Sequence, residues 1–257
     1  MGYRNIFDTH SHYDDEAFSQ DVDELLTKMP ELGVSHIVTC GVDLMSSAHA
    51  LDLAHKYPYV YAALGYHPEN IGDERKGDLD LICELLEAEE KAVAVGEIGL
   101  DYHYEDGAPK ETQIDLFKRQ IEMANDLDMP IIVHDRDAHD DTLRILKEYK
   151  PAGVVHCFSG SVEMAREVIK LGMYIGLGGV TTFKNARKAV EVARDIPIER
   201  LLLETDAPYM APVPFRGKRN DSSLIAYTAE RIAEIRGMDT QELIDITCEN
   251  AKRLFKI

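Results

Sequence analysis

Eight short runs of apolar and β-branched residues recur along this chain of 257 residues, and they constrain its fold more than any other feature. Such runs predict buried β-strands, and the longer segments between them have the spacing of amphipathic helices. The predicted strands are residues 5–8, 35–40, 60–64, 92–96, 131–134, 153–156, 174–177 and 201–204. Strands that alternate with helices in this way are typical of a parallel sheet built from repeated strand–helix units.

The number of units and the chain length decide between the two common forms of such a sheet. Eight strands followed by helices within about 250 residues are typical of a (β/α)8 TIM barrel. An open doubly wound sheet usually has a glycine-rich phosphate turn after its first strand, and the segment FDTHSHYDD has no glycine. Two last helices are predicted at 223–236 and 240–256, the second with a variant capping box formed by Asp239 and Glu242. Because no linker or low-complexity tract divides the chain, we predict one α/β barrel domain over residues 1–257.

The charge balance limits the partners of the protein. Lys and Arg number 28 against 47 Asp and Glu, which makes the net charge −19 and repels nucleic acid and anionic membranes at long range. A polyanionic substrate would therefore be held locally. The basic segment FRGKRN offers Arg216, Lys218 and Arg219 for that purpose, and the alternative is a solvated loop whose charges pair with nearby acids.

The cysteines and the apolar segments indicate where the protein works. Four cysteines lie far apart with no C-x-x-C pair, which favours reduced thiols over a disulfide framework. The N-terminal segment lacks a basic-then-apolar signal pattern, and no apolar run reaches the roughly 18 residues of a membrane span. We expect a cytoplasmic protein without a membrane partner.

Residues that bind metal ions stand at or just after the ends of five predicted strands. In barrel enzymes the active site is built at the carboxyl ends of the strands. A single strand-end histidine is more often structural, but accidents would not share one end of one barrel. The candidate ligands are His10, His12, Glu97, His134, His156 and Asp206.

The ligand types suit two divalent ions. Imidazole and carboxylate groups bind Zn, Mn, Co or Ni, whereas Mg prefers fewer nitrogens. Six ligands also exceed what one catalytic ion needs when a position stays open for water. We therefore expect two divalent ions, of Zn, Mn, Mg, Co or Ni. His10, His12 and Asp206 would hold one ion, and His134 and His156 the other, with Glu97 as a bridge.

A second acid accompanies Asp206. In the segment LLLETDAPY, Glu204 and Asp206 are two residues apart, so the alternation of a strand would point both side chains to one face. Buried acids are costly without a compensating cation, and the proposed metal pair supplies it.

Seven segments together resemble TatD-type metal-dependent hydrolases of the amidohydrolase superfamily, and five of them contain the candidate ligands. The segments are FDTHSH, GYHPE, GEIGLDY, VHDRDA, VHCFSG, ETDAPY and RGKRN. The resemblance runs from about Ile6 to the C-terminus. It implies a divalent-metal hydrolase with deoxyribonuclease activity, often 3′ to 5′ exonucleolytic, and it implies the same six ligands. Glu97 takes the place of the carbamylated lysine of many amidohydrolases, because Lys91 precedes the strand. After RGKRN, members commonly have an acid and a proline, whereas this chain has Asp221 and Ser222.

The predicted mechanism is hydrolysis of a phosphodiester by a metal-bound hydroxide. Asp206 would be both a ligand and the proton acceptor, aided by Glu204, and His67 would donate a hydrogen bond to the phosphate or to the leaving oxygen. With a net charge of −19 we expect few phosphate contacts with DNA, and a dependence of DNA affinity on salt no steeper than a log–log slope of about −4.

Two other functions fit the same residues. The first is hydrolysis of a small-molecule ester, lactone, amide or D-aminoacyl linkage, because the chemistry of attack at carbon and at phosphorus is shared. The second is a metal-binding module without catalytic activity.

Overall fold

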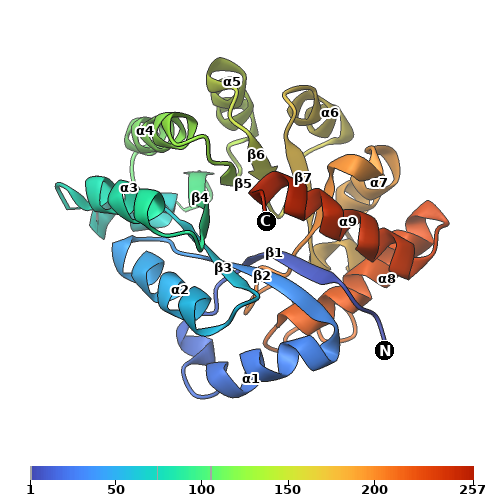
Figure 1. Ribbon diagram of the computed structural model, residues 1–257. Coiled ribbons are helices and arrows are strands. Elements are labelled where there is room, and N and C mark those ends of the chain that lie inside the picture. The colour runs from blue at the N-terminus through green and yellow to red at the C-terminus, as the bar shows by residue number, and fades with distance from the viewer. Residues whose placement is uncertain (1, 74, 105) are drawn as a thin grey trace.

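Eight parallel strands form one sheet in the order β1 to β8, and its two edges meet. A computed structural model describes residues 2–73, 75–104 and 106–257 (Figure 1). Strand β1 and the segment just after β8 are joined by a parallel bridge between Ser11 and Ala207, and the Asp206 N–H donates to the His10 carbonyl at 2.9 Å. The sheet is therefore the predicted (β/α)8 barrel. The strands are β1 (Ile6–Ser11), β2 (Val34–Cys40), β3 (Val60–Leu64), β4 (Ala92–Asp101), β5 (Ile131–Arg136), β6 (Gly153–Val155), β7 (Tyr174–Leu177) and β8 (Leu201–Leu203).

Helices surround the sheet, so that the strands are covered on their outer face (Figure 1). The last two predicted helices are present: a short 3-10 turn at Ser222–Leu224 leads into α8, and the Asp239 side chain caps α9 by accepting from the Glu242 N–H at 3.0 Å. No helix in the described ranges is both long and apolar enough to cross a membrane. The helices are α1 (Val22–Lys28), α2 (Leu44–Lys56), α3 (Asp78–Ala88), α4 (Lys110–Asp126), α5 (His139–Tyr149), α6 (Val162–Lys170), α7 (Arg187–Asp195), α8 (Ile225–Arg236) and α9 (Thr240–Phe255).

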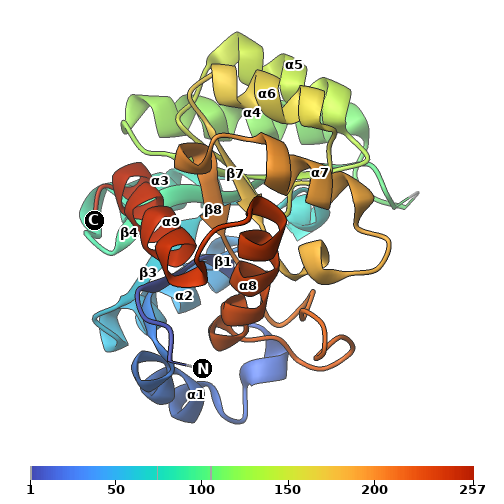
Figure 2. The same cartoon turned by 90° about the vertical axis from the view of Figure 1, so that its right-hand side faces the viewer.

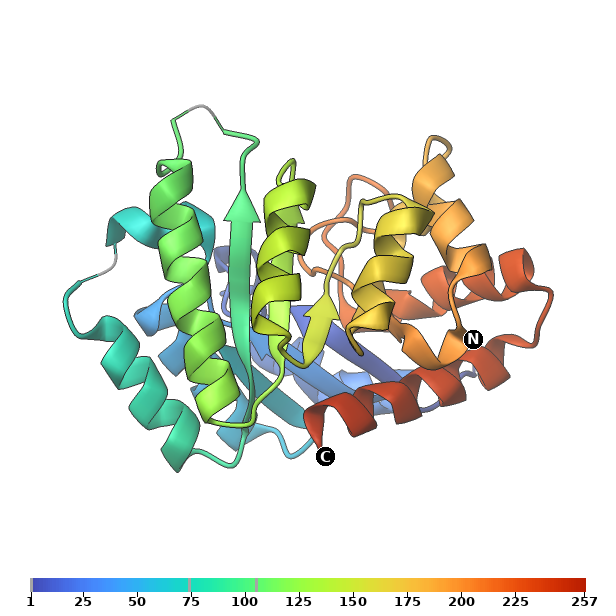
Figure 3. The same ribbon diagram turned by 90° about the horizontal axis from the view of Figure 1, so that it is seen from above.

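The apolar core has two parts. The larger part fills the layer between the strands and the surrounding helices. The smaller part lies inside the barrel, where side chains from all eight strands meet the last turns of α9, including Leu254 and Phe255. Helix α9 lies at the end of the barrel opposite to the arrowheads of the strands (Figures 2 and 3). It closes that end and leaves the carboxyl ends of the strands for a site.

Three strands run further than the sequence pattern predicts, and one of them is β5, which ends at Arg136 and not at residue 134. Strand β1 continues to Ser11 and β4 to Asp101, whereas β6 and β8 each end one residue early. The apolar pattern stops where polar residues begin, but the backbone ladder between β4 and β5 goes on through Gly99 and His134. His10 and Glu97 thus stand within strands, and rigid backbone positions both side chains.

Candidate metal centre

The six predicted ligands come together at the carboxyl end of the barrel. They lie at the floor of a cavity of about 960 Å³, and five of them line it: His12, Glu97, His134, His156 and Asp206. His10 is fully buried next to them, with its ring stacked on that of His156 at 3.8 Å between centroids.

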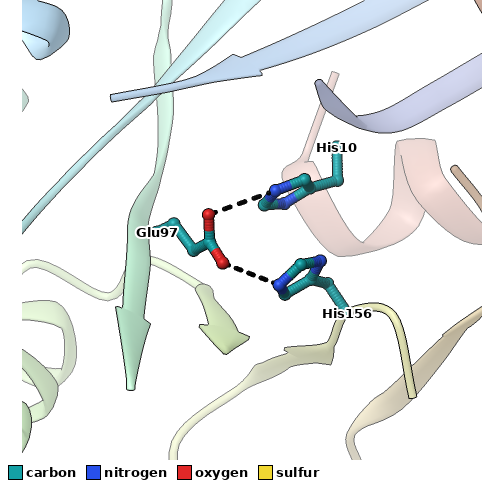
Figure 4. A group of neighbouring side chains, drawn as sticks. All are labelled: His10, Glu97 and His156. Atoms are coloured by element: carbon teal, nitrogen blue, oxygen red, sulfur yellow. Dashed lines mark ion pairs between the residues drawn. The ribbon is translucent and has the colours of Figure 1, made fainter. Parts of the chain in front are cut away.

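Glu97 occupies the centre of the cluster, and its two oxygens face different histidines. Its Oε2 atom lies 3.3 Å from Nε2 of His10 and 3.3 Å from Nε2 of His12. Its Oε1 atom lies 2.7 Å from Nε2 of His156 and 2.9 Å from Nδ1 of His134. Figure 4 shows one histidine of each pair against the carboxylate. On the first side, Asp206 Oδ1 lies 3.6 Å from His12 Nε2. One carboxylate thus joins two groups of ligand atoms.

The hydrogen bonds of the outer ring nitrogens decide which atoms face this carboxylate. His12 Nδ1 lies 2.9 Å from the Cys40 carbonyl, and His134 Nε2 lies 2.9 Å from Asp101 Oδ2, so in the neutral rings these nitrogens are the donors. The other nitrogen of each ring then turns a lone pair toward Glu97. Lone pairs that face carboxylate oxygens repel one another, and a divalent cation between them removes the conflict. The cluster therefore fits metal ions.

Burial and the neighbouring groups set the charge states of the cluster. Burial lowers the pKa of His10 to about 4, so this imidazole is neutral at pH 7. Burial acts to raise the pKa of Glu97, but the histidines around it, His156 foremost, outweigh this effect and hold the pKa well below its usual range. Burial also acts to raise the pKa of Asp206, and the hydrogen bond from His12 outweighs it. Neutral His10 and the two ionised carboxylates are already in the states that divalent metals require, whereas burial is outweighed by the carboxylates, which raise the pKa of His12, His134 and His156, so a metal would displace their protons.

Asp101 is a site residue that the sequence analysis missed. It is the last residue of β4, it is buried, and it holds His134 by the hydrogen bond to Nε2. The predicted strand ends at residue 96, five residues before Asp101, so the sequence pattern did not bring this residue to the site. Gly99 allows the close approach of β4 to β5, because a Cβ atom there would lie 2.0 Å from the His134 carbonyl oxygen. The signal for this residue in the sequence was the GEIGLDY segment, in which Asp101 stands two residues after Gly99.

His67 lies at the edge of the cluster and lines the cavity. Its Nδ1 atom accepts from the Glu69 N–H at 3.2 Å, which leaves the proton of the neutral ring on Nε2. That nitrogen is 3.5 Å from Glu97 Oε1, and burial lowers the pKa of the ring. His67 therefore presents an N–H donor beside the metal ligands.

The structure separates the two acids of the ETDAPY segment, which the alternation of a strand would have placed on one face. Strand β8 ends at Leu203, and Asp206 has a left-handed backbone with φ of 58°. Asp206 turns to the cavity, while Glu204 points to the neighbouring strands, where its Oε1 accepts from the Cys157 N–H. A Cβ atom at Gly176 would lie 2.3 Å from Glu204 Oε2. Burial raises the pKa of Glu204 to about 8, and within the described residues it does not line the cavity.

The three cations of the FRGKRN loop are not brought to the cluster. The guanidinium of Arg219 makes two bonds to Asp21 and lies over the ring of Phe18. Arg216 lies over Phe183 at 4.4 Å, and Lys218 lies near Phe215. None of the three lines the cavity in the described part of the chain, and their contact with substrate stays a prediction. The cations that do line it are Arg136, Arg187 and Lys188.

Ser222, which stands where family members commonly have proline, ties its turn to the barrel. Its hydroxyl donates to Asp8 Oδ2 at 2.6 Å, and its backbone N–H donates to the Tyr13 hydroxyl at 3.0 Å. A proline could make neither bond. Asp8 also accepts from the Thr205 hydroxyl at 2.6 Å, so this network connects β1 with the segment that carries Asp206.

Comparison with known proteins identifies the family of the chain. Residues 7–256 match the family model described as TatD related DNase. The chain is 46% identical over 255 residues to the protein named uncharacterized metal-dependent hydrolase YabD of Bacillus subtilis, covering 98% of this chain and 99% of that protein. It is 34% identical over 260 residues to the 3′-5′ ssDNA/RNA exonuclease TatD of Escherichia fergusonii, covering 98% and 99%. The crystal structure of YjjV, a TatD homologue from Escherichia coli, superimposes with a TM-score of 0.92 at 35% identity, covering 98% of each chain.

The matches span nearly the whole chain, at identities well above the level at which only the fold is shared. They agree with the seven motifs, which contain all six residues of the cluster. The chain thus belongs to the TatD related DNase family of metal-dependent hydrolases.

Proposed function

We propose that this protein is a nuclease that hydrolyses phosphodiester bonds of single-stranded DNA, as a 3′ to 5′ exonuclease, with two divalent ions. The observation that carries the proposal is the position of Glu97, whose two oxygens each face a separate pair of histidines. A bridging carboxylate between two ions requires this arrangement, and two ions a few ångströms apart are the usual device for phosphodiester hydrolysis. Similarity to a named single-strand exonuclease supports the substrate.

The ligands divide between two positions. His10, His12 and Asp206 would hold one ion. His134 and His156, which both face Oε1 of Glu97, would hold the other, with one oxygen of Glu97 on each ion. The Cys40 carbonyl and Asp101 would keep the outer nitrogens of His12 and His134 protonated, and so direct the inner nitrogens at the ions. Zn, Mn, Mg, Co and Ni remain the candidates, and the histidine content favours the transition metals.

The chain's own residues would perform the proton transfers. When bound, the ions lower the pKa of a water molecule and neutralise charge on the phosphate. Asp206 lines the cavity as an ionised carboxylate and would accept the proton of the attacking water. His67 would donate its Nε2–H to a phosphoryl oxygen or to the leaving oxygen. Glu204, buried beside the Cys157 N–H, would act through the backbone of the strand ends and not on substrate.

One assay panel tests the proposal. Metal content is counted by mass spectrometry, and the purified protein is offered single-stranded DNA, an abasic duplex and simple esters with Mg, Mn, Zn or Co. We expect about two ions per chain and shortening of single-stranded DNA from its 3′ end. The Asp206→Asn variant is the control, since DNA loss that persists in it comes from a contaminating nuclease. Turnover of the esters with intact DNA would assign the alternative function of small-molecule hydrolysis.

A further inference from the structure

Two hollows of the surface meet at the beginning of α7. The metal cavity and a second hollow of about 500 Å³ share Ala186 and Arg187 in their linings. The shared residues place the two hollows next to each other, the first at the metal ligands and the second along α7. Figure 3 shows α7 beside the loops that follow the strands.

The path is lined by cations that lack partners. Lys188 lines the metal cavity, and Lys184 and Arg194 line the second hollow. All three are exposed and make no hydrogen bond or ion pair with any described residue. Arg187 carries a bond to Glu191 at 3.0 Å and adds to the same face. On a chain with a net charge of −19, unpaired cations concentrated at one place offer a polyanion a local point of attachment.

Acidic side chains line another part of the metal cavity. Asp14, Asp15 and Glu69 line it on the side of the loops after β1 and β3. A polyanion that places one phosphate at the metal ligands is therefore repelled from these acids and attracted to the cations at the start of α7. The exposed rings of Tyr104 and Tyr209 also line the cavity and can stack against bases.

We propose that a single-stranded nucleic acid runs from the metal cavity across α7, with its phosphates against Lys188 and Arg187 in the cavity and against Lys184 and Arg194 in the second hollow. This inference rests on the proposed nuclease function and adds the path of the strand beyond the cleaved bond. It places the main electrostatic contact on the segment FKNARK and the helix that follows, and not on the FRGKRN loop.

The test compares a long and a short substrate in a variant with two charges removed outside the cavity. Lys184→Gln combined with Arg194→Gln weakens the outer part of the path. Lys28→Gln combined with Lys56→Gln, on α1 and α2, removes two charges from side chains that are 57% and 54% exposed and is the matched control. The substrates are a single strand of about 20 nucleotides, longer than one binding path, and a dinucleotide that ends within the cavity.

The measured quantity is the ratio of kcat/KM for the long strand to kcat/KM for the dinucleotide. We expect this ratio to fall about tenfold in the Lys184→Gln, Arg194→Gln variant, and the log–log salt slope of kcat/KM on the long strand to become shallower by about 1.4 for two lost phosphate contacts. The control should keep the native ratio. Equal melting temperatures of native protein and variants show that the fold is unchanged.

Three outcomes would overturn the path. If the Lys184→Gln, Arg194→Gln variant cleaves both substrates with the same ratio of kcat/KM as the native protein, the proposed path is wrong and the nuclease function still stands. An equal fall in the control assigns the effect to net charge alone. If the native protein cleaves neither substrate in the presence of its metal, both the proposed nuclease function and the proposed path are wrong.

Discussion

The two ends of the barrel are built from opposite kinds of side chain. At the carboxyl end, buried positions hold His10, Glu97 and His156, whose polar atoms face one another. At the other end, the interior is apolar and is closed by α9, where Phe255 packs against Phe7 at 6.0 Å between ring centroids. One end concentrates groups that are costly to bury without a metal, and the other end contributes stability through burial alone. The comparison predicts that function and stability separate along the barrel axis.

The largest expected effect comes from the bridging position. Glu97→Gln removes the charge that joins the two groups of histidines while it keeps the shape of the side chain. We expect kcat/KM on DNA to fall by about a thousandfold or more, since the lost charge is worth about 4 kcal/mol in the transition state. Steady-state kinetics measure this, with Glu111→Gln at the exposed start of α4 as the control. A loss below tenfold would mean that Glu97 does not bridge.

The next effect belongs to the opposite end. Phe255→Ala should lower the free energy of unfolding by about 3 kcal/mol, because it leaves a cavity where α9 closes the barrel. Urea denaturation measures the change, and Phe255→Leu should lose much less. At temperatures where the variant is folded, kcat should stay close to native. A loss of activity without a loss of stability would break the separation of the two ends.

Asp101 tests how the carboxyl end is organised around its ligands. Asp101→Asn keeps the size of the side chain but removes the charge that fixes His134. We expect the dissociation constant of the ion that His134 would hold to rise by about 10- to 100-fold, as is usual when the partner of a ligating histidine is changed. Metal titration followed by calorimetry gives this value. Asp106→Asn, on the exposed loop beyond β4, is the control, and equal effects would remove the proposed role of Asp101.

Metal binding should depend on pH with a definite sign. Without metal, burial acts to lower the pKa of His134, but the hydrogen bonds with Asp101 and Glu97 outweigh it and raise the pKa to about 10. The pKa of His12 is also raised well above its usual value, since its bonds to Asp206 and Glu97 exceed the effect of burial. Both rings therefore carry protons at pH 7 that a metal must displace. Affinity should rise about tenfold per pH unit for each proton released, which calorimetry in buffers of different ionisation enthalpy detects. No proton release at pH 7 would contradict these assignments.

The smallest effect is expected from the basic loop. Arg216→Gln with Lys218→Gln removes two cations that lie over Phe183 and near Phe215 and that do not line the metal cavity in the described structure. We expect kcat/KM on single-stranded DNA to change by about twofold or less, because distant exposed charges are screened by salt. A tenfold loss of kcat/KM would support the substrate-binding role that the basic composition of the loop suggested.

Much of the barrel could be predicted because its signals are local. The alternation of apolar runs and helical spacing located all eight strands, and the capping side chain of Asp239 located the start of α9. The ends of β1 and β4 could not be predicted in the same way. Their last residues are polar and buried by neighbours that are distant in the sequence, so the apolar pattern stops before the strand does.

The ligand set could be predicted, but its neighbours could not. The six candidate ligands all lay at one predicted end of the barrel. Seven motifs in order indicated the family, which the comparisons confirm. Asp101, by contrast, lies beyond the predicted end of its strand, and the sequence pattern singled out FRGKRN and not FKNARK as the basic segment. Similar clusters of charge look equal in a sequence, and only the path of the chain decides which one borders the cavity.

The sequence by itself therefore determined the alternation of elements, the family and the residue types at the carboxyl ends of the strands, because these depend on local periodicity and on short motifs. Only the tertiary structure decided that Glu97 lies between two pairs of histidines, that Glu204 turns away from Asp206, and that the cations of α7 border the cavity. These relations join segments that are far apart in the chain. They follow from the register of the strands and from side-chain packing, which no local pattern encodes.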